Sequence, residues 1–184
     1  ITSELSALAM PHGKFQISIS QLSVDDIDSY TNEGINQVAM LFTSHGGELL
    51  PISKAASGGE LSRLMLAIEV VIASKFPVGT YIFDEVDAGI GGKAALEVGK
   101  RLRALASERQ VIVVTHLPQV AIWADRHIVV TKDESGKVTT SSLTTVDGND
   151  REIEIARMLS GVEDSEHAQE HARELLNLRK TQVR

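Results

Sequence analysis

Two short apolar runs, at 80–83 and 111–114, most strongly limit how this chain can fold. Each run is nearly continuous, which is typical of strands covered on both faces in a parallel sheet. Between them, apolar residues repeat over 95–105 at the spacing of one helix face. A strand, a helix and a second strand in this order predict a right-handed crossover that connects two parallel strands.

Other segments predict antiparallel strands. Alternating apolar and polar residues predict a half-buried strand at 15–20, and a second strand is predicted at 38–42. Residues 127–131 and 137–142 flank the turn-forming segment Asp133-Glu-Ser-Gly136 and predict a hairpin. The sequence therefore predicts a layered α/β domain with a mostly parallel sheet, helices on its faces and an antiparallel hairpin at the edge.

Helical spacing of apolar residues predicts three more helices, at 61–72, 153–159 and 165–178, while glycine and proline predict a loop at 43–54. The first of these helices has a predicted buried face made of Leu61, Leu64, Met65, Ile68, Val71 and Ile72. Leu5–Ala9 is expected to be the end of a helix, because Pro11 and Gly13 follow it. A chain that enters the end of a helix at once is interpreted as a piece of a longer protein.

The composition excludes several kinds of site. The chain has 184 residues, enough for one domain with a substantial core. It contains no cysteine, which excludes disulfides and thiolate metal sites. Its net charge of −7 argues against a dominant basic surface for nucleic acid, and no apolar run approaches the ~20 residues of a membrane span. We therefore expect a cytoplasmic protein.

The segment Ser57-Gly-Gly-Glu60 directly precedes the first long helical pattern. Serine and glutamate at this spacing form a capping box, in which each side chain binds a free backbone amide of the helix start. The capping box leaves the two glycines unexplained. Paired glycines would also let an anion approach bare amides at the positive end of the helix dipole, so structural capping and an anion site both remain open.

Polar side chains follow both predicted parallel strands. Asp84 and Glu85 come directly after the first strand, Asp87 continues the acidic turn, and His116 follows the second strand. Because the carboxyl ends of parallel strands meet at one edge, these side chains are expected to lie close together. One carboxylate could hold Mg²⁺ against phosphate and another could deprotonate water, with the histidine donating to a phosphoryl group.

Two other motif matches are weaker. Gly89-Ile-Gly-Gly-Lys-Ala94 fits a dinucleotide fingerprint and resembles a phosphate-binding loop, but it lies six residues beyond the strand and has Ala94 where a phosphate loop needs Ser or Thr. His167-Ala-Gln-Glu-His171 fits an inverted zincin motif, but the short remaining chain offers no third ligand far downstream. Neither match is favoured, and the second is more simply interpreted as a solvated helix surface.

Four segments together resemble a known family. Residues 54–63 (KAASGGELSR), 82–92 (IFDEVDAGIGG), 114–121 (VTHLPQVA) and 154–161 (EIARMLSG) are similar to the C-terminal head region of the RecN family of bacterial DNA repair proteins, in the SMC-like branch of the ABC ATPases. The resemblance extends from about residue 5 to residue 178. It implies the C-terminal lobe of an ABC/SMC-type P-loop ATPase head.

The resemblance implies a role for each conspicuous residue, with ATP and Mg²⁺ as cofactors. Ser57, Gly58, Gly59 and Glu60 match the signature motif, which contacts the γ-phosphate of ATP held by the opposite head of a dimer. Ala55 is a mild departure, since a larger aliphatic residue is common there.

The remaining motif residues follow the same carry-over. Asp84 matches the Walker B aspartate near Mg²⁺, and Glu85 matches the catalytic glutamate. Asp87 resembles the D-loop aspartate, and His116 the switch histidine. Together these matches imply that Glu85 and His116 carry the chemistry of ATP hydrolysis.

The resemblance also implies an organisation and partners. Residues 1–10 would end a returning coiled-coil helix, and residues 11–184 would form the lobe. The Walker A loop belongs to an N-terminal lobe in this family, so this chain alone is expected to be inactive. The implied partners are that N-terminal lobe, a second head in an ATP-dependent homodimer, and DNA bound by the full-length protein in the nucleoid, with no membrane contact.

Two alternatives remain. A transporter ATPase lobe is disfavoured because Glu60 stands where transporters usually carry glutamine. A non-catalytic module, in which nucleotide serves only to join two copies, is disfavoured by Glu85, because dimerisation alone would not need a second carboxylate.

Overall fold

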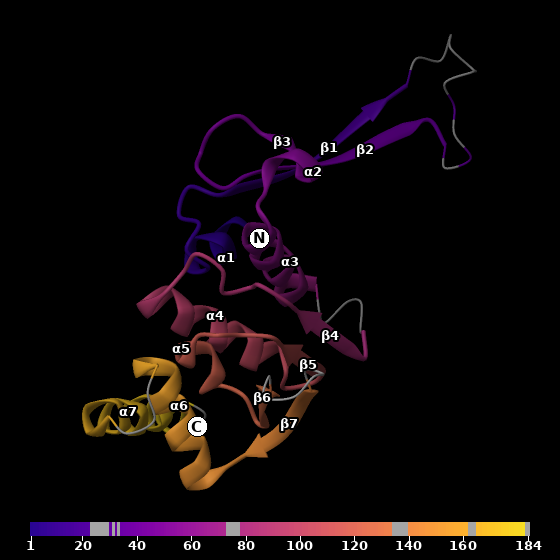
Figure 1. Ribbon diagram of the computed structural model, residues 1–184. Helices are drawn as coiled ribbons and strands as arrows, with labels where there is room; N and C mark the ends of the chain where they lie inside the picture. Colours follow the sequence, from indigo (N-terminus) through magenta and orange to yellow (C-terminus); the bar gives the residue numbers. More distant parts are fainter. Residues whose placement is uncertain are drawn as a thin grey trace.

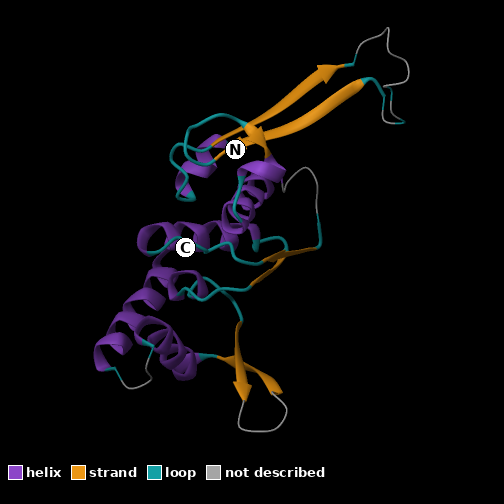
Figure 2. Cartoon of the chain, turned by 45° about the horizontal axis from the view of Figure 1, so that its top comes forward, coloured by secondary structure: helices purple, strands orange, loops and turns teal. Residues whose placement is uncertain are grey.

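The computed structural model describes residues 1–22, 30, 32, 34–72, 78–133, 140–161 and 165–182. The helices are α1 (Thr2–Ala7), α2 (Ile52–Ala55), α3 (Gly58–Ile72), α4 (Gly92–Leu105), α5 (Pro118–Ala121), α6 (Gly148–Ser160) and α7 (Glu166–Gln182). The strands are β1 (Lys14–Gln21), β2 (Asn36–Thr43), β3 (Leu50–Pro51), β4 (Thr80–Phe83), β5 (Gln110–Val113), β6 (His127–Asp133) and β7 (Thr140–Val146). The helices form one body, from which the β1–β2 and β6–β7 hairpins extend (Figure 2).

The predicted order of strand, helix and parallel strand is confirmed. Strands β4 and β5 pair in parallel, from Thr80 opposite Gln110 to Phe83 opposite Val113, and α4 connects them. The described strands also form an antiparallel sheet of order β1-β2-β3 and an antiparallel β6–β7 pair. The α/β class with an antiparallel hairpin is therefore correct, although antiparallel pairing contributes more of the described strands than a mostly parallel sheet implies.

The prediction that both faces of the parallel strands are covered is wrong for the described residues. Tyr81 and Phe83 are buried in the core that α4 helps to form. On the other face, Ile82 is 71% exposed, Ile112 46% and Val114 59%. A continuous apolar run therefore does encode two apolar faces, but helices cover only one of them here.

The β1–β2 hairpin shows a similar difference from the prediction of a half-buried strand. It projects from the body (Figure 1), and Ile17 lies opposite Met40 while Ile19 lies opposite Val38. All four side chains are exposed, by 51% to 68%. Their direct cross-strand pairing places them on one face, so the alternation is real but its apolar side faces solvent.

Helix α3 begins close to the predicted position but buries a different face. Of the six residues predicted to be buried, only Leu64 is fully buried, and Leu61, Met65 and Val71 are exposed. The buried positions are Gly59, Arg63, Leu64, Leu66 and Ala67. The physical reason is that this side of α3 packs on the turn after β4, as described below. The helix ends at Ile72, as predicted, while Pro77 lies outside the described residues.

Two apolar clusters make the core. The first joins α1, the end of β2, α3, β4 and α4, and the predicted positions Ala95, Val98, Leu102 and Leu105 of α4 are all buried in it. The second joins α5, α6 and α7 around Ile122, Trp123 and Ile155. The first cluster therefore supports the end of the parallel strands, and the second lies toward the C-terminus.

Smaller differences concern element limits. The predicted loop at 43–54 contains β3 and α2, and the short helix α5 was not predicted. Helix α6 begins at Gly148, before the predicted 153. Pairing of β6 with β7 continues to Val146, while most of the predicted turn at 133–136 lies outside the described residues. Among the helices of the described residues, none is both long and apolar enough to span a membrane.

Candidate active site

The ends of β4 and β5 bring together the polar residues predicted to meet. The Val114 amide donates to the Phe83 carbonyl at 3.0 Å, which continues the parallel pairing to the last residue before Asp84. The segments Asp84–Asp87 and Thr115–His116 therefore leave the sheet at the same edge. This part of the predicted site is confirmed as an arrangement in space.

Asp87 is the residue that joins these two segments. Its side chain is 2% exposed, and its carboxylate accepts hydrogen bonds from the Thr115 hydroxyl and, at 3.2 Å, from the His116 amide. Nδ1 of His116 lies 3.4 Å from Oδ2 of Asp87, while the imidazole is 74% exposed. Asp87 thus holds the backbone and ring of His116 at a fixed place with the ring facing solvent.

Glu85 has an unusual backbone. Its φ is +56°, in the left-handed region that residues other than glycine rarely adopt. The Glu85 carbonyl accepts from the Ala88 amide at 3.0 Å, so the strand turns sharply here and the carboxylates of Asp84 and Glu85 are exposed. Strained backbone of this kind persists only where surrounding contacts hold it, and it is frequent at active sites.

The predicted capping box is present at the start of α3. The Ser57 amide donates to Oε2 of Glu60 at 2.9 Å, the Ser57 hydroxyl donates to the same oxygen at 3.0 Å, and the Glu60 amide donates to the Ser57 hydroxyl at 3.4 Å. Partial burial raises the pKa of Glu60. Hydrogen bonds from Ser44 and Ser57 and the nearby His45 lower it by more, so the net pKa is below its usual value. Glu60 therefore favours the charged state.

The two glycines of this segment have a packing explanation. A Cβ atom on Gly58 would lie 2.8 Å from Oε2 of Glu85. A Cβ atom on Gly59 would lie 2.8 Å from Cβ of Ala88 and 3.2 Å from the Glu85 carbonyl oxygen. Gly59 is thus required for the start of α3 to approach the backbone of the turn after β4, whereas at Gly58 the flexible end of the Glu85 side chain could move aside. The sequence did not predict this close approach.

Two further residues at this contact were missed. The Ser62 hydroxyl donates to the Asp84 carbonyl at 2.8 Å, and Nη1 of Arg63 donates to the Ala88 carbonyl at 2.7 Å. Arg63 is only 6% exposed, although the helical pattern placed it outside the predicted buried face. The one available signal was a charged residue next to the apolar positions of α3, which does not reveal a partner 25 residues away.

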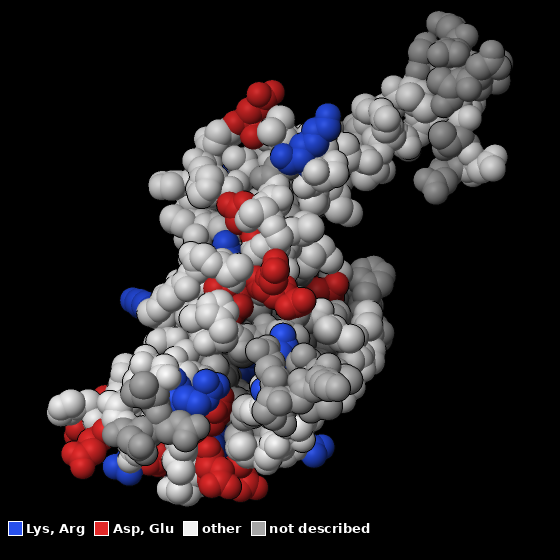
Figure 3. Space-filling model, in the orientation of Figure 1, with Lys and Arg blue, Asp and Glu red and all other residues white. Residues whose placement is uncertain are grey.

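The start of α3 and the β4–α4 segment form part of the wall of an open pocket of about 640 Å³. Met10, His45, Ser57, Arg63 and Ala88 are among its lining residues. Acidic side chains gather over the middle of the molecule, where α3 and the β4–α4 segment meet (Figure 3). An exposed carboxylate there can provide an oxygen ligand to Mg²⁺, whose other ligands are commonly water and phosphate.

The two weaker motif matches gain no support from the structure. Gly89–Ala94 runs from the turn into the first turn of α4, and His167 and His171 lie exposed on α7. Within the described residues, no three His, Cys, Asp or Glu side chains are grouped to hold a metal ion.

Solved structures with the same fold are SMC heads. The Smc head domain with a coiled coil and joint from Pyrococcus yayanosii matches with a TM-score of 0.57 and 22% identity, over 81% of this chain and 26% of that chain. The Smc head domain with an extended coiled coil bound to the C-terminal domain of ScpA from Pyrococcus furiosus matches with a TM-score of 0.55 and 23% identity, over 79% and 33%. The fold is therefore that of part of an SMC-type head.

The sequence relatives are more specific. A DNA repair protein RecN of Streptomyces coelicolor is 50% identical over 96% of this chain and 32% of its own length. A RecN of Deinococcus radiodurans is 47% identical over 92% and 29%. The chain is thus a relative of the RecN proteins and spans about a third of their length, as the motif resemblance predicted. A scan of protein-family models gave no match.

Proposed function

We propose that this chain is the C-terminal lobe of the ATPase head of a RecN-like protein of double-strand-break repair. Residues 1–10 would end a coiled-coil helix and residues 11–184 would form the lobe. ATP would join two heads, hydrolysis would separate them, and the holding of DNA would follow the state of the heads. The observation that carries this proposal is the meeting of the α3 start, Asp84-Glu85 and His116 at one edge of the sheet.

The chemistry follows from the exposed groups at that edge. Bound ATP with Mg²⁺ would supply the phosphoryl group, with Asp84 as the carboxylate beside the metal. Glu85 would accept a proton from the attacking water, because its carboxylate is exposed on a turn that α3 holds in place. His116 would donate a hydrogen bond toward the phosphoryl oxygens, since Asp87 holds its other side.

The start of α3 would serve the ATP of the opposite head. Ser57, Gly58, Gly59 and Glu60 present the helix N-terminus, and a helix N-terminus attracts negative charge. Such an interaction contributes about 0.3–2 kcal/mol, so it could complete a nucleotide site but could not hold ATP alone. Asp87 would act mainly through His116, since its own carboxylate is buried.

The uncovered apolar faces support the need for an N-terminal lobe. Ile82, Ile112 and Val114 on the parallel strands are exposed, as are the apolar side chains of the β1–β2 hairpin. Monomeric soluble proteins rarely leave contiguous apolar patches uncovered, and large ones mark interaction sites. This lobe alone is therefore proposed to be inactive, and active only with the lobe that carries Walker A, in the cytoplasm at the nucleoid.

Glu85→Gln tests the catalytic role in the full-length protein. Loss of a general base should lower ATP turnover by ~10²–10⁴-fold, while ATP-dependent dimers accumulate because hydrolysis no longer separates them. Steady-state hydrolysis and size-exclusion chromatography measure the two effects. Glu174→Gln, the same exchange on the exposed surface of α7, is the matched control and should change neither.

Ser57→Arg tests the role in the opposite head. Hydrolysis should be lost in the dimer, while ATP binding to an isolated head remains, because Ser57 would contact only the partner's nucleotide. Unchanged turnover in Glu85→Gln contradicts the catalytic assignment and favours the dimerisation module. Equal loss of ATP binding by an isolated Ser57→Arg head contradicts the in-trans role.

A further inference from the structure

Two neighbouring residues of α3 donate hydrogen bonds to the turn that carries Glu85. Ser62 donates to the Asp84 carbonyl at 2.8 Å, and Arg63 donates to the Ala88 carbonyl at 2.7 Å. These carbonyls lie on either side of Glu85 in the chain. The two contacts therefore fix both ends of the turn to one rigid helix.

The turn needs such support because of its backbone. Glu85 has a φ of +56°, and a residue with a side chain is rarely stable in this region without outside contacts. The Ala88 amide donates to the Glu85 carbonyl at 3.0 Å, but this bond lies within the turn itself. The contacts from Ser62 and Arg63 come from a different element and can hold the turn against α3.

Burial of Arg63 at this contact costs free energy, which indicates that the contact has a role other than stability. Arg63 is only 6% exposed, and among the described residues its Nε has no hydrogen-bond partner. Burying a charge is unfavourable unless it is fully hydrogen-bonded. Gly59 makes the approach possible, because a Cβ atom there would lie 2.8 Å from Cβ of Ala88 and 3.2 Å from the Glu85 carbonyl oxygen.

We propose that Ser62 and Arg63 are positioning residues that hold the Glu85 carboxylate in place for the attack of water. This inference rests on the proposed ATPase function and adds two residues to it that the motif comparison did not assign. Neither residue needs to touch ATP. Their loss should therefore lower kcat with little change in KM for ATP, because a small displacement of a catalytic group lowers the rate without removing the groups that bind substrate.

The test uses the full-length protein with the variants Ser62→Ala, Arg63→Lys and Arg63→Gln. Arg63→Gln should lower kcat by about tenfold or more, Ser62→Ala by about threefold, and Arg63→Lys should retain part of the activity, while KM for ATP changes by less than about threefold. Ser107→Ala is the matched control, since the Ser107 hydroxyl also donates to a backbone carbonyl, that of Ala104, on the exposed end of α4. It should leave kcat unchanged.

A double-mutant cycle with Glu85→Gln separates positioning from general damage. If Arg63 acts through Glu85, then Arg63→Gln should cause almost no further loss in the Glu85→Gln background. Full multiplication of the two losses overturns the proposal, as does an unchanged kcat in both Ser62→Ala and Arg63→Gln. If Arg63→Gln does not fold, Ser62→Ala and Arg63→Lys decide by the same criterion. Unchanged turnover of Glu85→Gln itself would instead contradict the proposed function.

Discussion

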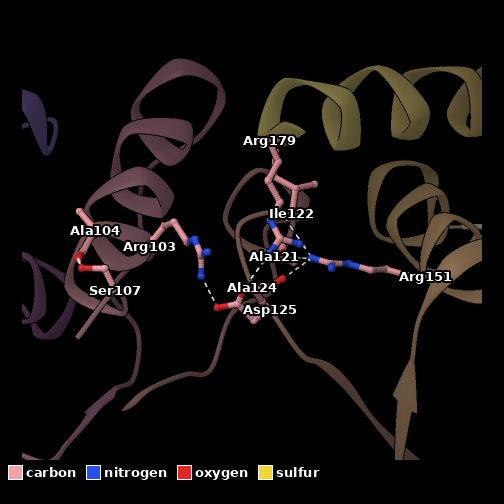
Figure 4. A network of polar contacts seen from close by, with 9 residues as sticks. All are labelled: Arg103, Ala104, Ser107, Ala121, Ile122, Ala124, Asp125, Arg151 and Arg179. Atoms are coloured by element: carbon pink, nitrogen blue, oxygen red, sulfur yellow. Dashed lines mark hydrogen bonds and ion pairs between the residues drawn. The ribbon is translucent and has the colours of Figure 1, made fainter. Parts of the chain in front are cut away.

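Two contacts in this molecule are built in the same way and have different surroundings. At the α3 contact, Gly59 lets α3 approach Ala88, and Arg63 donates to the Ala88 carbonyl. At the α5 contact, Gly99 of α4 lets the Trp123 ring approach, and Arg151 of α6 donates to backbone carbonyls of the turn after α5 (Figure 4). Each contact thus combines a glycine that permits close packing with an arginine that binds main-chain oxygens.

The difference lies in what each turn presents. The turn at the α3 contact carries the exposed carboxylates of Asp84 and Glu85. The turn at the α5 contact lies in the apolar cluster of α5, α6 and α7, and its exposed residue Asp125 is bound by Arg103 and Arg179 (Figure 4). The same packing therefore supports exposed chemical groups in one place and joins helices in the other, so changes at the two contacts should separate activity from stability.

The largest expected effect is that of Gly59→Ala on turnover. The added Cβ would meet Cβ of Ala88 at 2.8 Å and must displace the turn that carries Glu85. A shift of about 1 Å in a catalytic group can lower the rate by ~10²-fold. Steady-state ATP hydrolysis by the full-length protein measures this, and wild-type turnover would show that the close approach is not needed for activity.

Gly99→Ala should act on stability instead. Its Cβ would overlap with the buried Trp123 ring, and overpacking of a core lowers the free energy of unfolding by about 1–3 kcal/mol, which exceeds or cancels the ~1 kcal/mol gained by removing glycine from a helix. Denaturant unfolding of this chain at low concentration, followed by the fluorescence of Trp123, its single tryptophan, reports the change. Turnover per folded molecule should stay within twofold or so of the wild type.

Arg151→Gln should lower stability by about 1–2 kcal/mol. Nη2 of Arg151 donates to the carbonyls of Ala121, Ile122 and Ala124 at 3.0, 3.1 and 2.8 Å, and the shorter amide cannot reach all three. The same denaturation measurement tests this. If Arg151→Gln also lowered kcat per folded molecule, the difference between the two contacts would be contradicted, because the α5 contact would then belong to the catalytic machinery.

Beside the α5 contact, His127, the first residue of β6, should make the free energy of unfolding slightly dependent on pH. Burial lowers the pKa of His127 below its ordinary value of 6.5, and the charge of Arg151 lowers it further. The folded state therefore binds this proton less readily than the unfolded state, so the stabilisation is complete above the unfolded pKa and is lost as the pH falls toward the folded pKa. As the pH is lowered from about 7.5 to about 5.5, the midpoint of denaturant unfolding should fall less in His127→Gln than in the wild type.

The sequence predicted the features of this comparison that depend on local pattern. The crossover of β4, α4 and β5, the capping box of Ser57 and Glu60, and the contact of Asp87 with His116 at one edge of the sheet follow from helical spacing and from the geometry of parallel strands. These features require only neighbouring residues or a single topological rule, and the structure contains all of them.

The sequence did not predict the arginines and glycines of the two contacts. Burial of Arg63 depends on the Ala88 carbonyl, and the closeness of Gly99 depends on Trp123, so both are set by tertiary approach rather than by local preference. The α5 helix of only four residues is too short for a periodic signal. The exposed faces of β1 and β4 could not be foreseen, because a single sequence encodes apolarity but not which neighbour covers it.

The projecting β1–β2 hairpin has a practical consequence. In the described sheet of order β1-β2-β3, β1 is an edge strand, so one side of its backbone is open to pairing with another chain. Edge strands are normally protected by charges or proline, yet β1 has a single charged residue, Lys14, and carries exposed Ile17 and Ile19. This chain produced by itself should therefore associate and precipitate as its concentration rises, and production together with the proposed N-terminal lobe should keep it in solution.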